Sequence, residues 1–318
     1  MSVAFVFPGQ GAQYVGMGQT LAKAYPIAAK TLAEADEALG FSLSQIIAEG
    51  PEEKLRLTYY TQPAIMAVSI AAWRVFEEAV EIIPSFVAGH SLGEYTALVA
   101  SGAIAYEDAL RLVYKRGKLM DEAVPAGEGA MAAVLGADVE LLTALCKTVS
   151  EETGVPVEMA NINCPGQVTV SGAAKAVDEL IKRAQEAKAR RAVRLDVSGP
   201  FHSSLMAPAA DYLAKALHDT TWKPLHMPLV ANVSAQPLTT VNEVTAALKA
   251  QLAAPVRWED SVRTMVSEGV HTFVEFGPGT VLSGLVRKTE KSAKTLHVED
   301  PETLLETVKF LSGEVNPS

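Results

Sequence analysis

Three short apolar segments of the chain each lead directly into a glycine-containing turn, and this repeated pattern limits the possible folds most strongly. The segments are residues 4–7, 86–88 and 272–276, and helical sequence follows the turns, as at residues 94–100 and 281–288. Short apolar strands that alternate with longer helices favour a mostly parallel sheet with helices on both faces. The sequence therefore predicts an α/β protein.

The pattern changes between residues 128 and 198. Strand-like segments (130–135, 155–162, 168–171 and 192–197) and helical segments (138–152 and 174–189) follow one another here in the order β-α-β-β-α-β. A ferredoxin-like unit has this order and can close a small sheet of its own. We therefore expect a subdomain of residues 128–198, inserted into a large domain of residues 1–127 and 199–318.

The composition of the 318 residues excludes several classes of protein. Apolar residues make up 49% of the chain, which suits a large core, and the net charge of −10 argues against a surface devoted to nucleic acid or anionic lipid. The two cysteines, Cys146 and Cys164, are isolated, so neither a zinc site nor a disulfide framework is expected. Neither a signal-peptide pattern nor an apolar run of about 20 residues is present, and we expect a cytoplasmic protein with no membrane contact.

The strongest local motif is G-x-S-x-G at residues 89–93, between a predicted strand and a predicted helix. This context predicts a tight turn that presents the Ser91 hydroxyl at the carboxyl edge of the sheet. The helix that begins there directs free backbone N–H groups toward the same point, and the Leu92 N–H is placed to receive a developing oxyanion. Ser91 is therefore a candidate nucleophile.

A serine nucleophile needs a base, and histidine suits this task near neutral pH. Among six histidines, His90 adjoins the serine and is expected to diverge from it, whereas His202 lies in the loop that returns from the inserted unit to the large domain. His202 is therefore the candidate base, although sequence spacing alone does not establish contact. No acidic residue between these positions stands at an obvious strand end, so a backbone carbonyl or an amide is an alternative partner for the imidazole.

Arg116 is predicted to face inward from a helix over residues 107–123. Leu112, Val113, Leu119 and Met120 lie three or four positions away from it, on the same helix face. An inward guanidinium needs an anion, which is either a structural carboxylate or a carboxylate of the substrate.

Two further features of the sequence each have a structural and a functional interpretation. The loop at residues 8–11 is a plain turn or presents the Gln10 amide as a second oxyanion donor. A basic run is a solvated face or a docking patch for an acidic partner. This run contains Lys182, Arg183, Lys188, Arg190, Arg191 and Arg194.

These motifs together resemble those of bacterial malonyl-CoA:acyl carrier protein transacylases, a family of acyltransferases. The shared segments, in the family's order from about residue 3 to residue 290, are 7–11, 61–64, 89–94, 116–117, 201–203, 251–258 and 275–279. The resemblance implies a large α/β-hydrolase-like domain with a mostly parallel sheet and an inserted ferredoxin-like subdomain.

The resemblance also assigns roles, with acyl transfer in two steps through a malonyl ester on the serine. It makes Ser91 the nucleophile and His202 its base, and it makes the Gln251 backbone carbonyl the group that orients the imidazole. It places Gln10 and the Leu92 N–H in the oxyanion hole, Arg116 on the malonyl carboxylate, and Phe201 where an α-methyl branch would lie. No metal or cofactor is implied. The implied partners are malonyl-CoA, coenzyme A and an acidic acyl carrier protein, which the basic run would contact.

Alternatives remain at this point. The same turn occurs in serine hydrolases and thioesterases, and a module that only docks a carrier protein would lack the serine or the histidine. The same motifs also occur in stand-alone acyltransferases that serve polyketide synthases and in the acyl-transfer component of malonate decarboxylase. We expect a monomer that supplies extender units for fatty-acid synthesis.

Overall fold

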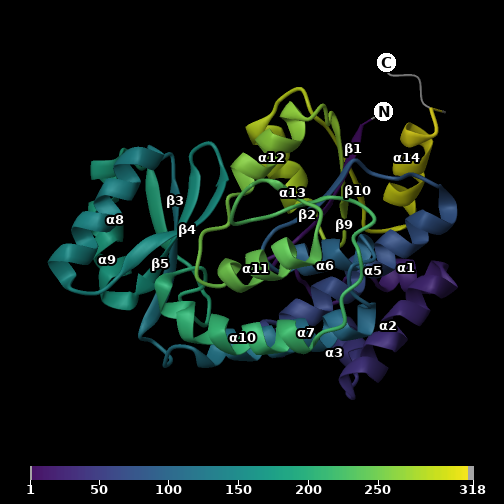
Figure 1. Ribbon diagram of the computed structural model, residues 1–318, viewed down its shortest axis with the longest axis horizontal. Helices are drawn as coiled ribbons and strands as arrows, with labels where there is room; N and C mark the ends of the chain where they lie inside the picture. The colour runs from purple at the N-terminus through teal and green to yellow at the C-terminus, as the bar shows by residue number, and fades with distance from the viewer. Residues whose placement is uncertain (1, 314–318) are drawn as a thin grey trace.

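The protein has two lobes, each built on its own sheet (Figure 1). The computed structural model describes residues 2–313. The larger lobe holds six strands in the order β10-β9-β1-β2-β7-β8, of which all neighbours are parallel except β7 and β8. The strands are β1 (Val3–Phe7), β2 (Phe86–Gly89), β7 (Leu229–Val230), β8 (Pro237–Leu238), β9 (Thr272–Phe276) and β10 (Lys294–Val298). The predicted α/β class with a mostly parallel sheet is confirmed.

Helices cover both faces of this sheet because side chains along β1 alternate between two cores. Phe5 packs edge-on against Phe76 and Phe276, with ring centroids 5.6 and 4.9 Å away. Ala4 lies in the opposite core, which includes Trp258. The helices of the large lobe are α1 (Gln19–Ala24), α2 (Pro26–Leu39), α3 (Leu43–Glu49), α4 (Glu52–Leu55), α5 (Thr58–Ala79), α6 (Leu92–Ala100), α7 (Tyr106–Glu122), α10 (Ala207–Asp219), α11 (Val241–Gln251), α12 (Trp258–Ser267), α13 (Val281–Thr289) and α14 (Pro301–Leu311), and a 3₁₀ turn, η2 (Ser204–Met206), precedes α10.

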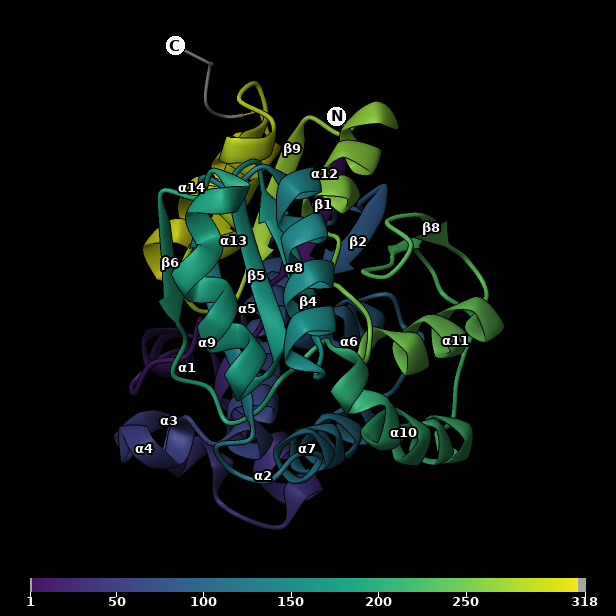
Figure 2. The same cartoon turned by 90° about the vertical axis from the view of Figure 1, so that its left-hand side faces the viewer.

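The smaller lobe is a four-stranded antiparallel sheet in the order β4-β5-β3-β6. Its elements are β3 (Gly129–Leu135), α8 (Val139–Thr153), β4 (Val157–Cys164), β5 (Gln167–Ala173), α9 (Ala174–Arg183), the 3₁₀ turn η1 (Ala184–Ala187) and β6 (Arg191–Arg194). Figure 2 shows α8 and α9 on the outer face of this sheet. This β-α-β-β-α-β order is the one predicted for a ferredoxin-like unit. The domain boundaries themselves, at residues 128 and 198, stay predictions.

Some predicted boundaries in the smaller lobe are wrong. The helix predicted over residues 174–189 ends at Arg183, because the chain tightens into η1 and Lys188 then adopts a left-handed conformation with φ 56°. The strand predicted over residues 192–197 pairs with β3 only as far as Arg194. The Leu195 N–H makes a last hydrogen bond to Met131 of β3, at 2.8 Å, and Leu195 and Val197 line the cleft between the lobes.

The register between β1 and β2 determines where the loops that follow these two strands lie. Phe7 pairs with Gly89, so β1 and β2 end at the same level and their following turns are neighbours. The loop after β1 and the turn that carries Ser91 therefore meet at the carboxyl edge of the sheet. Among residues 2–313, no helix combines the length and the apolar character needed to cross a membrane.

Candidate active site

Ser91 lies in a tight turn between β2 and α6, with φ 52° and ψ −103°. A Cβ atom on Gly89 would lie 1.9 Å from the carbonyl carbon of Gly93, and one on Gly93 would lie 2.0 Å from the carbonyl oxygen of Phe7. Both contacts are with backbone, which cannot move aside as a flexible side chain can. Gly89 is therefore required by the tightness of the turn itself, and Gly93 by the close approach of the turn to β1.

Asn232 holds this turn from the far side. The Ser91 N–H donates to Asn232 Oδ1 at 2.8 Å, and Asn232 Nδ2 donates to the carbonyl of Gly89 at 2.7 Å. The sequence analysis did not find this residue. Its position shortly after β7 is the only sequence signal, because polar residues at the ends of parallel strands gather at one edge of the sheet.

His202 meets the serine directly. Its Nε2 lies 2.8 Å from Ser91 Oγ, and its Nδ1 lies 2.8 Å from the backbone carbonyl of Gln251. Burial lowers the pKa of His202 to about 3, and the Arg116 cation acts in the same direction. The imidazole is therefore neutral near pH 7, so Nδ1–H donates to the carbonyl and the Nε2 lone pair faces the hydroxyl.

Arg116 is fully buried, as its helix face predicts, and it also reaches the nucleophile. Its Nη2 donates to Ser91 Oγ at 3.1 Å and to Gln251 Oε1 at 2.9 Å, and its Nη1 donates to Gln62 Oε1 at 2.8 Å. The guanidinium lies over the Tyr95 ring, 5.2 Å from its centroid. Within residues 2–313, Arg116 forms no ion pair, so no structural carboxylate of the described chain binds it directly. The side-chain amides of Gln62 and Gln251 accept its hydrogen bonds instead.

The groups proposed for the oxyanion hole adjoin the serine. Leu92 is the first residue of α6, so its N–H has no acceptor within the helix, and it finds none elsewhere in the described chain. The backbone N–H and the side chain of Gln10 likewise form no hydrogen bond with the described residues. Gln10 and Ser91 line the same cavity. Unused donors are thus present both in the residue after the nucleophile and in the loop after β1.

The cavity that contains Ser91 and His202 lies between the lobes and holds about 250 Å³. Phe201, only 5% exposed, forms part of its wall. The small sheet contributes polar side chains that the sequence analysis did not assign, namely Asn161, Asn163, Gln167 and Thr169. Asn161 and Asn163 are two residues apart, a spacing that places both side chains on the same face of a strand, and this spacing was the available sequence signal for them. His90 points away from Ser91, with its Nε2 2.8 Å from Asn163 Oδ1.

Glu94 is a second residue to which the sequence analysis gave no separate role. Its carboxyl is fully buried in the first turn of α6 and accepts a hydrogen bond from Gln251 Nε2. Burial raises the pKa of Glu94 to about 7, while the hydrogen bonds it accepts and the Arg116 cation act in the opposite direction. An acidic residue in an otherwise apolar helix was the sequence signal for this group.

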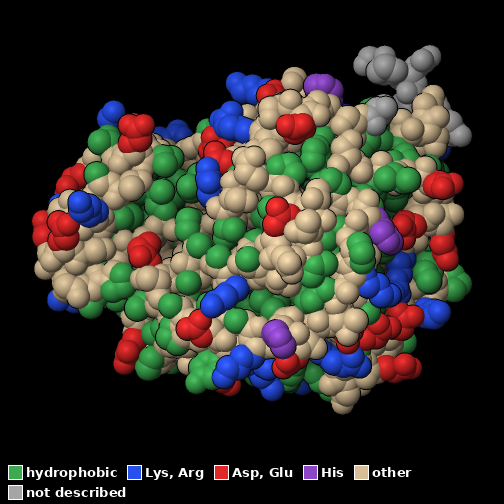
Figure 3. Space-filling model, viewed as in Figure 1, with side chains coloured by type: hydrophobic (Ala, Val, Ile, Leu, Met, Phe, Trp, Pro, Cys, Tyr) green, Lys and Arg blue, Asp and Glu red, His purple; other side chains and the backbone are tan. Residues whose placement is uncertain are grey.

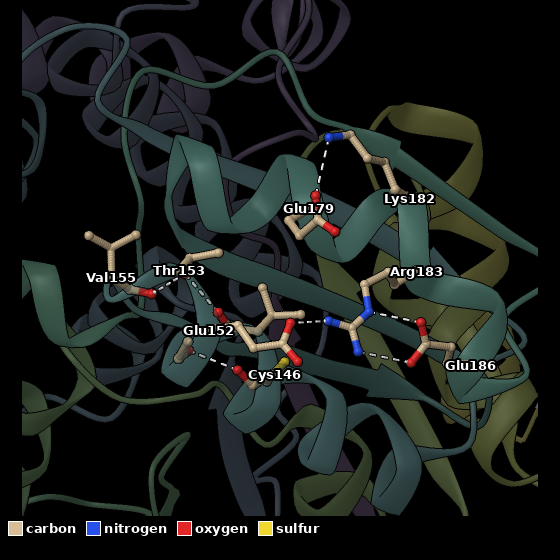
Figure 4. Close-up of polar contacts among 10 residues, drawn as sticks. Cys146, Glu152, Thr153, Val155, Glu179, Lys182, Arg183 and Glu186 are labelled. Atoms are coloured by element: carbon tan, nitrogen blue, oxygen red, sulfur yellow. Dashed lines mark hydrogen bonds and ion pairs between the residues drawn. The ribbon is translucent and has the colours of Figure 1, made fainter.

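The predicted basic run is partly neutralised by carboxylates of its own lobe. Arg183 donates to Glu152 and to both oxygens of Glu186, and Lys182 donates to Glu179 at 3.2 Å (Figure 4). Arg194 pairs with Asp178 at 2.7 Å. The members of the run without an ion pair in the described chain are Lys188, Arg190 and Arg191. Blue and red side chains are likewise interspersed on the face in Figure 3.

A serine hydroxyl 2.8 Å from a neutral histidine at a strand–helix turn, with unused N–H donors nearby, is the arrangement of an enzyme that transfers acyl groups through serine. The chain belongs to the acyl transferase domain family, whose sequence profile matches residues 4–306. It is 50% identical over 312 residues to the malonyl CoA-acyl carrier protein transacylase of Bacillus subtilis, and the match covers 98% of both chains.

Solved structures agree with this assignment. An acyl carrier protein S-malonyltransferase from Vibrio cholerae is 42% identical and superposes with a TM-score of 0.94, over 96% of this chain and all of that one. A malonyl-transacylase solved in complex with a type II polyketide synthase acyl-carrier protein is also 42% identical, with a TM-score of 0.95 over 98% of this chain and all of that one. The predicted family and the implied fold are confirmed.

Proposed function

We propose that the protein transfers the malonyl group of malonyl-CoA to the phosphopantetheine thiol of acyl carrier protein, through a malonyl ester on Ser91. The observation that carries this proposal is the position of Arg116. A buried cation with only neutral partners lies 3.1 Å from the candidate nucleophile. An acyl group that carries its own carboxylate supplies an anion that can bind the guanidinium directly, and malonyl is such a group. The names of the full-length relatives support the same substrates.

In the first half-reaction, Ser91 Oγ attacks the thioester carbonyl of malonyl-CoA while His202 Nε2 takes the hydroxyl proton. The carbonyl of Gln251 stabilises the imidazolium that forms, through the 2.8 Å hydrogen bond to Nδ1. The Leu92 N–H and Gln10 receive the oxyanion. When the C–S bond breaks, the imidazolium returns its proton to the sulfur, so coenzyme A leaves as a thiol and the malonyl ester remains.

The second half-reaction repeats these steps with another thiol. The pantetheine thiol of the carrier protein loses its proton to His202 Nε2 and attacks the ester carbonyl. The C–O bond then breaks, and Ser91 Oγ takes the proton back from the imidazolium. No metal or cofactor takes part in the proposed sequence.

Specificity follows from Arg116 and Phe201. Acylation turns Ser91 Oγ into an ester oxygen, which is a weak acceptor, and this frees Nη2 of Arg116 for the malonyl carboxylate. An acetyl group would leave the buried guanidinium without a directly bound anion, which is a larger penalty than the roughly 1–3 kcal/mol that a methylene provides. Phe201 fills the space beside His202 and disfavours an α-methyl branch more weakly.

We assign the reaction to fatty-acid synthesis, with supply of a polyketide synthase as the second candidate. The second candidate is supported by the solved relative that carries a polyketide acyl-carrier protein. For either carrier, we propose Lys188, Arg190 and Arg191 as the docking patch, because their charges have no partner in the described chain. A monomeric state and a cytoplasmic location stay predictions.

Intact mass after a brief pulse of malonyl-CoA tests the covalent mechanism. The native chain should gain one malonyl group and lose it when carrier protein is added, whereas Ser91→Ala should gain none. Equal labelling of Ser91→Ala would refute the mechanism. Release of free malonate faster than malonyl-carrier would favour the hydrolase alternative.

A further inference from the structure

Glu94 is a buried carboxyl group to which the proposed mechanism gives no part. It lies three residues after the nucleophile and is completely shielded from solvent. Its Oε2 accepts a hydrogen bond from Gln251 Nε2, but its Oε1 has no partner among the described residues. A buried carboxylate with an unsatisfied oxygen is costly unless a cation or a proton compensates it.

The Gln251 side chain connects this carboxyl to Arg116. Its Oε1 accepts from Arg116 Nη2 at 2.9 Å, while its Nε2 donates to Glu94 and also to the backbone carbonyl of Ser91, at 3.0 Å. The donors on one side and the acceptors on the other fix the orientation of the amide. Each end of the amide dipole therefore faces the charge that it stabilises. Because Arg116 has no direct ion pair in the described chain, Glu94 is its nearest counter-charge through this amide.

The other ionisable groups around Glu94 keep one state near neutral pH. Burial lowers the pKa of His202 to about 3 and raises the pKa of Tyr95 to about 12, and burial also lowers the pKa of His90. Burial lowers the pKa of the Arg116 guanidinium as well, but this group starts so high that it stays protonated. The pKa of Glu94, at about 7, leaves it as the member of the cluster that changes charge in this range.

We propose that Glu94 is a positioning residue that balances the charge of Arg116 in the free enzyme and takes up a proton when a malonyl carboxylate binds the guanidinium. The inference rests on the proposed function. A second anion beside Arg116 leaves the cluster with an excess negative charge. A proton from solvent that bonds to the unpartnered Oε1 restores the balance, and no other bond changes.

The sign of the linkage follows from the charges. A bound carboxylate raises the pKa of Glu94 above its value in the free enzyme, because it adds a negative charge nearby. Malonyl binding is therefore strongest below the pKa of the free enzyme and weakens as the pH rises toward the pKa of the complex. A rise of about one unit in pKa corresponds to a roughly tenfold loss of affinity. An acetyl group, which has no carboxylate, should not produce this effect.

Proton uptake can be measured directly by calorimetry. The Ser91→Ala variant binds substrate without transfer, and its binding enthalpy in buffers of different ionisation enthalpy gives the number of protons taken up. Near neutral pH, binding of malonyl-CoA should take up a larger fraction of a proton than binding of acetyl-CoA. Acetyl-CoA is the control because it carries the same coenzyme A phosphates. At a pH about 1.5 units higher, the affinity for malonyl-CoA should fall by up to about tenfold more than that for acetyl-CoA.

Variants at Glu94 in the Ser91→Ala background assign the proton. Glu94→Gln keeps the shape without the charge, so the additional uptake should disappear and the affinity for malonyl-CoA should depend on pH no more than the affinity for acetyl-CoA does. Glu94→Asp keeps a carboxylate and should restore the uptake. When Arg116→Ala is also present, the Glu94→Gln variant and the chain that keeps Glu94 should show the same proton uptake with malonyl-CoA.

Two outcomes would overturn the role of Glu94, and a different one would overturn the proposed function. Equal proton uptake with both thioesters, or additional uptake that persists in Glu94→Gln, refutes the linkage. The comparison of the two thioesters uses the Ser91→Ala variant alone. It can therefore be made even if Glu94→Gln does not fold. If the native chain forms no malonyl adduct on Ser91, the proposed function itself fails.

Discussion

Replacement of Arg116 by alanine is the sharpest test of how the site selects its acyl group. In the native chain, the guanidinium lies 3.1 Å from Ser91 Oγ and has no carboxylate partner in the described residues. Removal of one partner of a buried ion pair costs about 3–5 kcal/mol, so acylation by malonyl-CoA should slow by about two to four orders of magnitude. Acylation by acetyl-CoA, which has no carboxylate to pair, should be retained or should rise.

The same change also removes two hydrogen-bond donors. Gln62 Oε1 and Gln251 Oε1 would each lose a bond, at about 1–3 kcal/mol of stability for each buried acceptor left unpaired. Rates of adduct formation on Ser91 should therefore be compared between the two thioesters within one variant, by rapid quench and intact mass. Lys115→Ala, an exposed position on the same helix, is the matched control and should change neither rate. An equal loss with both thioesters would mean that Arg116 is only structural.

The remaining predictions concern the turn, the docking patch and the base. Gly93→Ala should lower the free energy of unfolding by more than about 3 kcal/mol in a denaturant titration, because its Cβ would lie 2.0 Å from a backbone oxygen of β1. The control is Gly284→Ala, whose Cβ would have no atom within 4 Å, and this variant should be neutral or stabilising. Neutral substitution of Arg190 and Arg191 should raise the KM for carrier protein severalfold and flatten its salt dependence without changing the first acylation step, and unchanged carrier kinetics would discard the patch. Because burial lowers the pKa of His202 to about 3, kcat/KM should stay level as the pH falls below the usual histidine pKa of about 6.5, and a loss centred near that value would contradict a neutral imidazole in the free enzyme.

The elements that place the nucleophile were predictable from local sequence. The β1 and β2 segments are short, apolar and closed by glycines, and these properties give the strand–turn–helix around Ser91 without knowledge of the rest of the chain. The position of His202 between the two lobes favoured it over the other histidines, but its contact with the serine depends on how distant segments pack.

Other parts of the site could not be predicted from residue type. The partner of His202 is a backbone carbonyl, which every residue possesses, so only the family resemblance pointed to Gln251. Asn232 acts on the turn from 141 positions away. Arg183 is paired with Glu152, 31 positions earlier, so the sequence did not show that part of the basic run is neutralised. These contacts are set by the pairing of strands and the packing of helices, which linear spacing does not record.

Gln251 serves the site with two chemically separate parts. Its main chain supports the imidazole, and its side chain bonds the guanidinium. A mutation at this position removes the side-chain hydrogen bonds to Arg116, Glu94 and the Ser91 carbonyl, while the backbone acceptor for His202 stays in place. Substitutions of this side chain can therefore change how the acyl group is bound without removing the acceptor that orients the base.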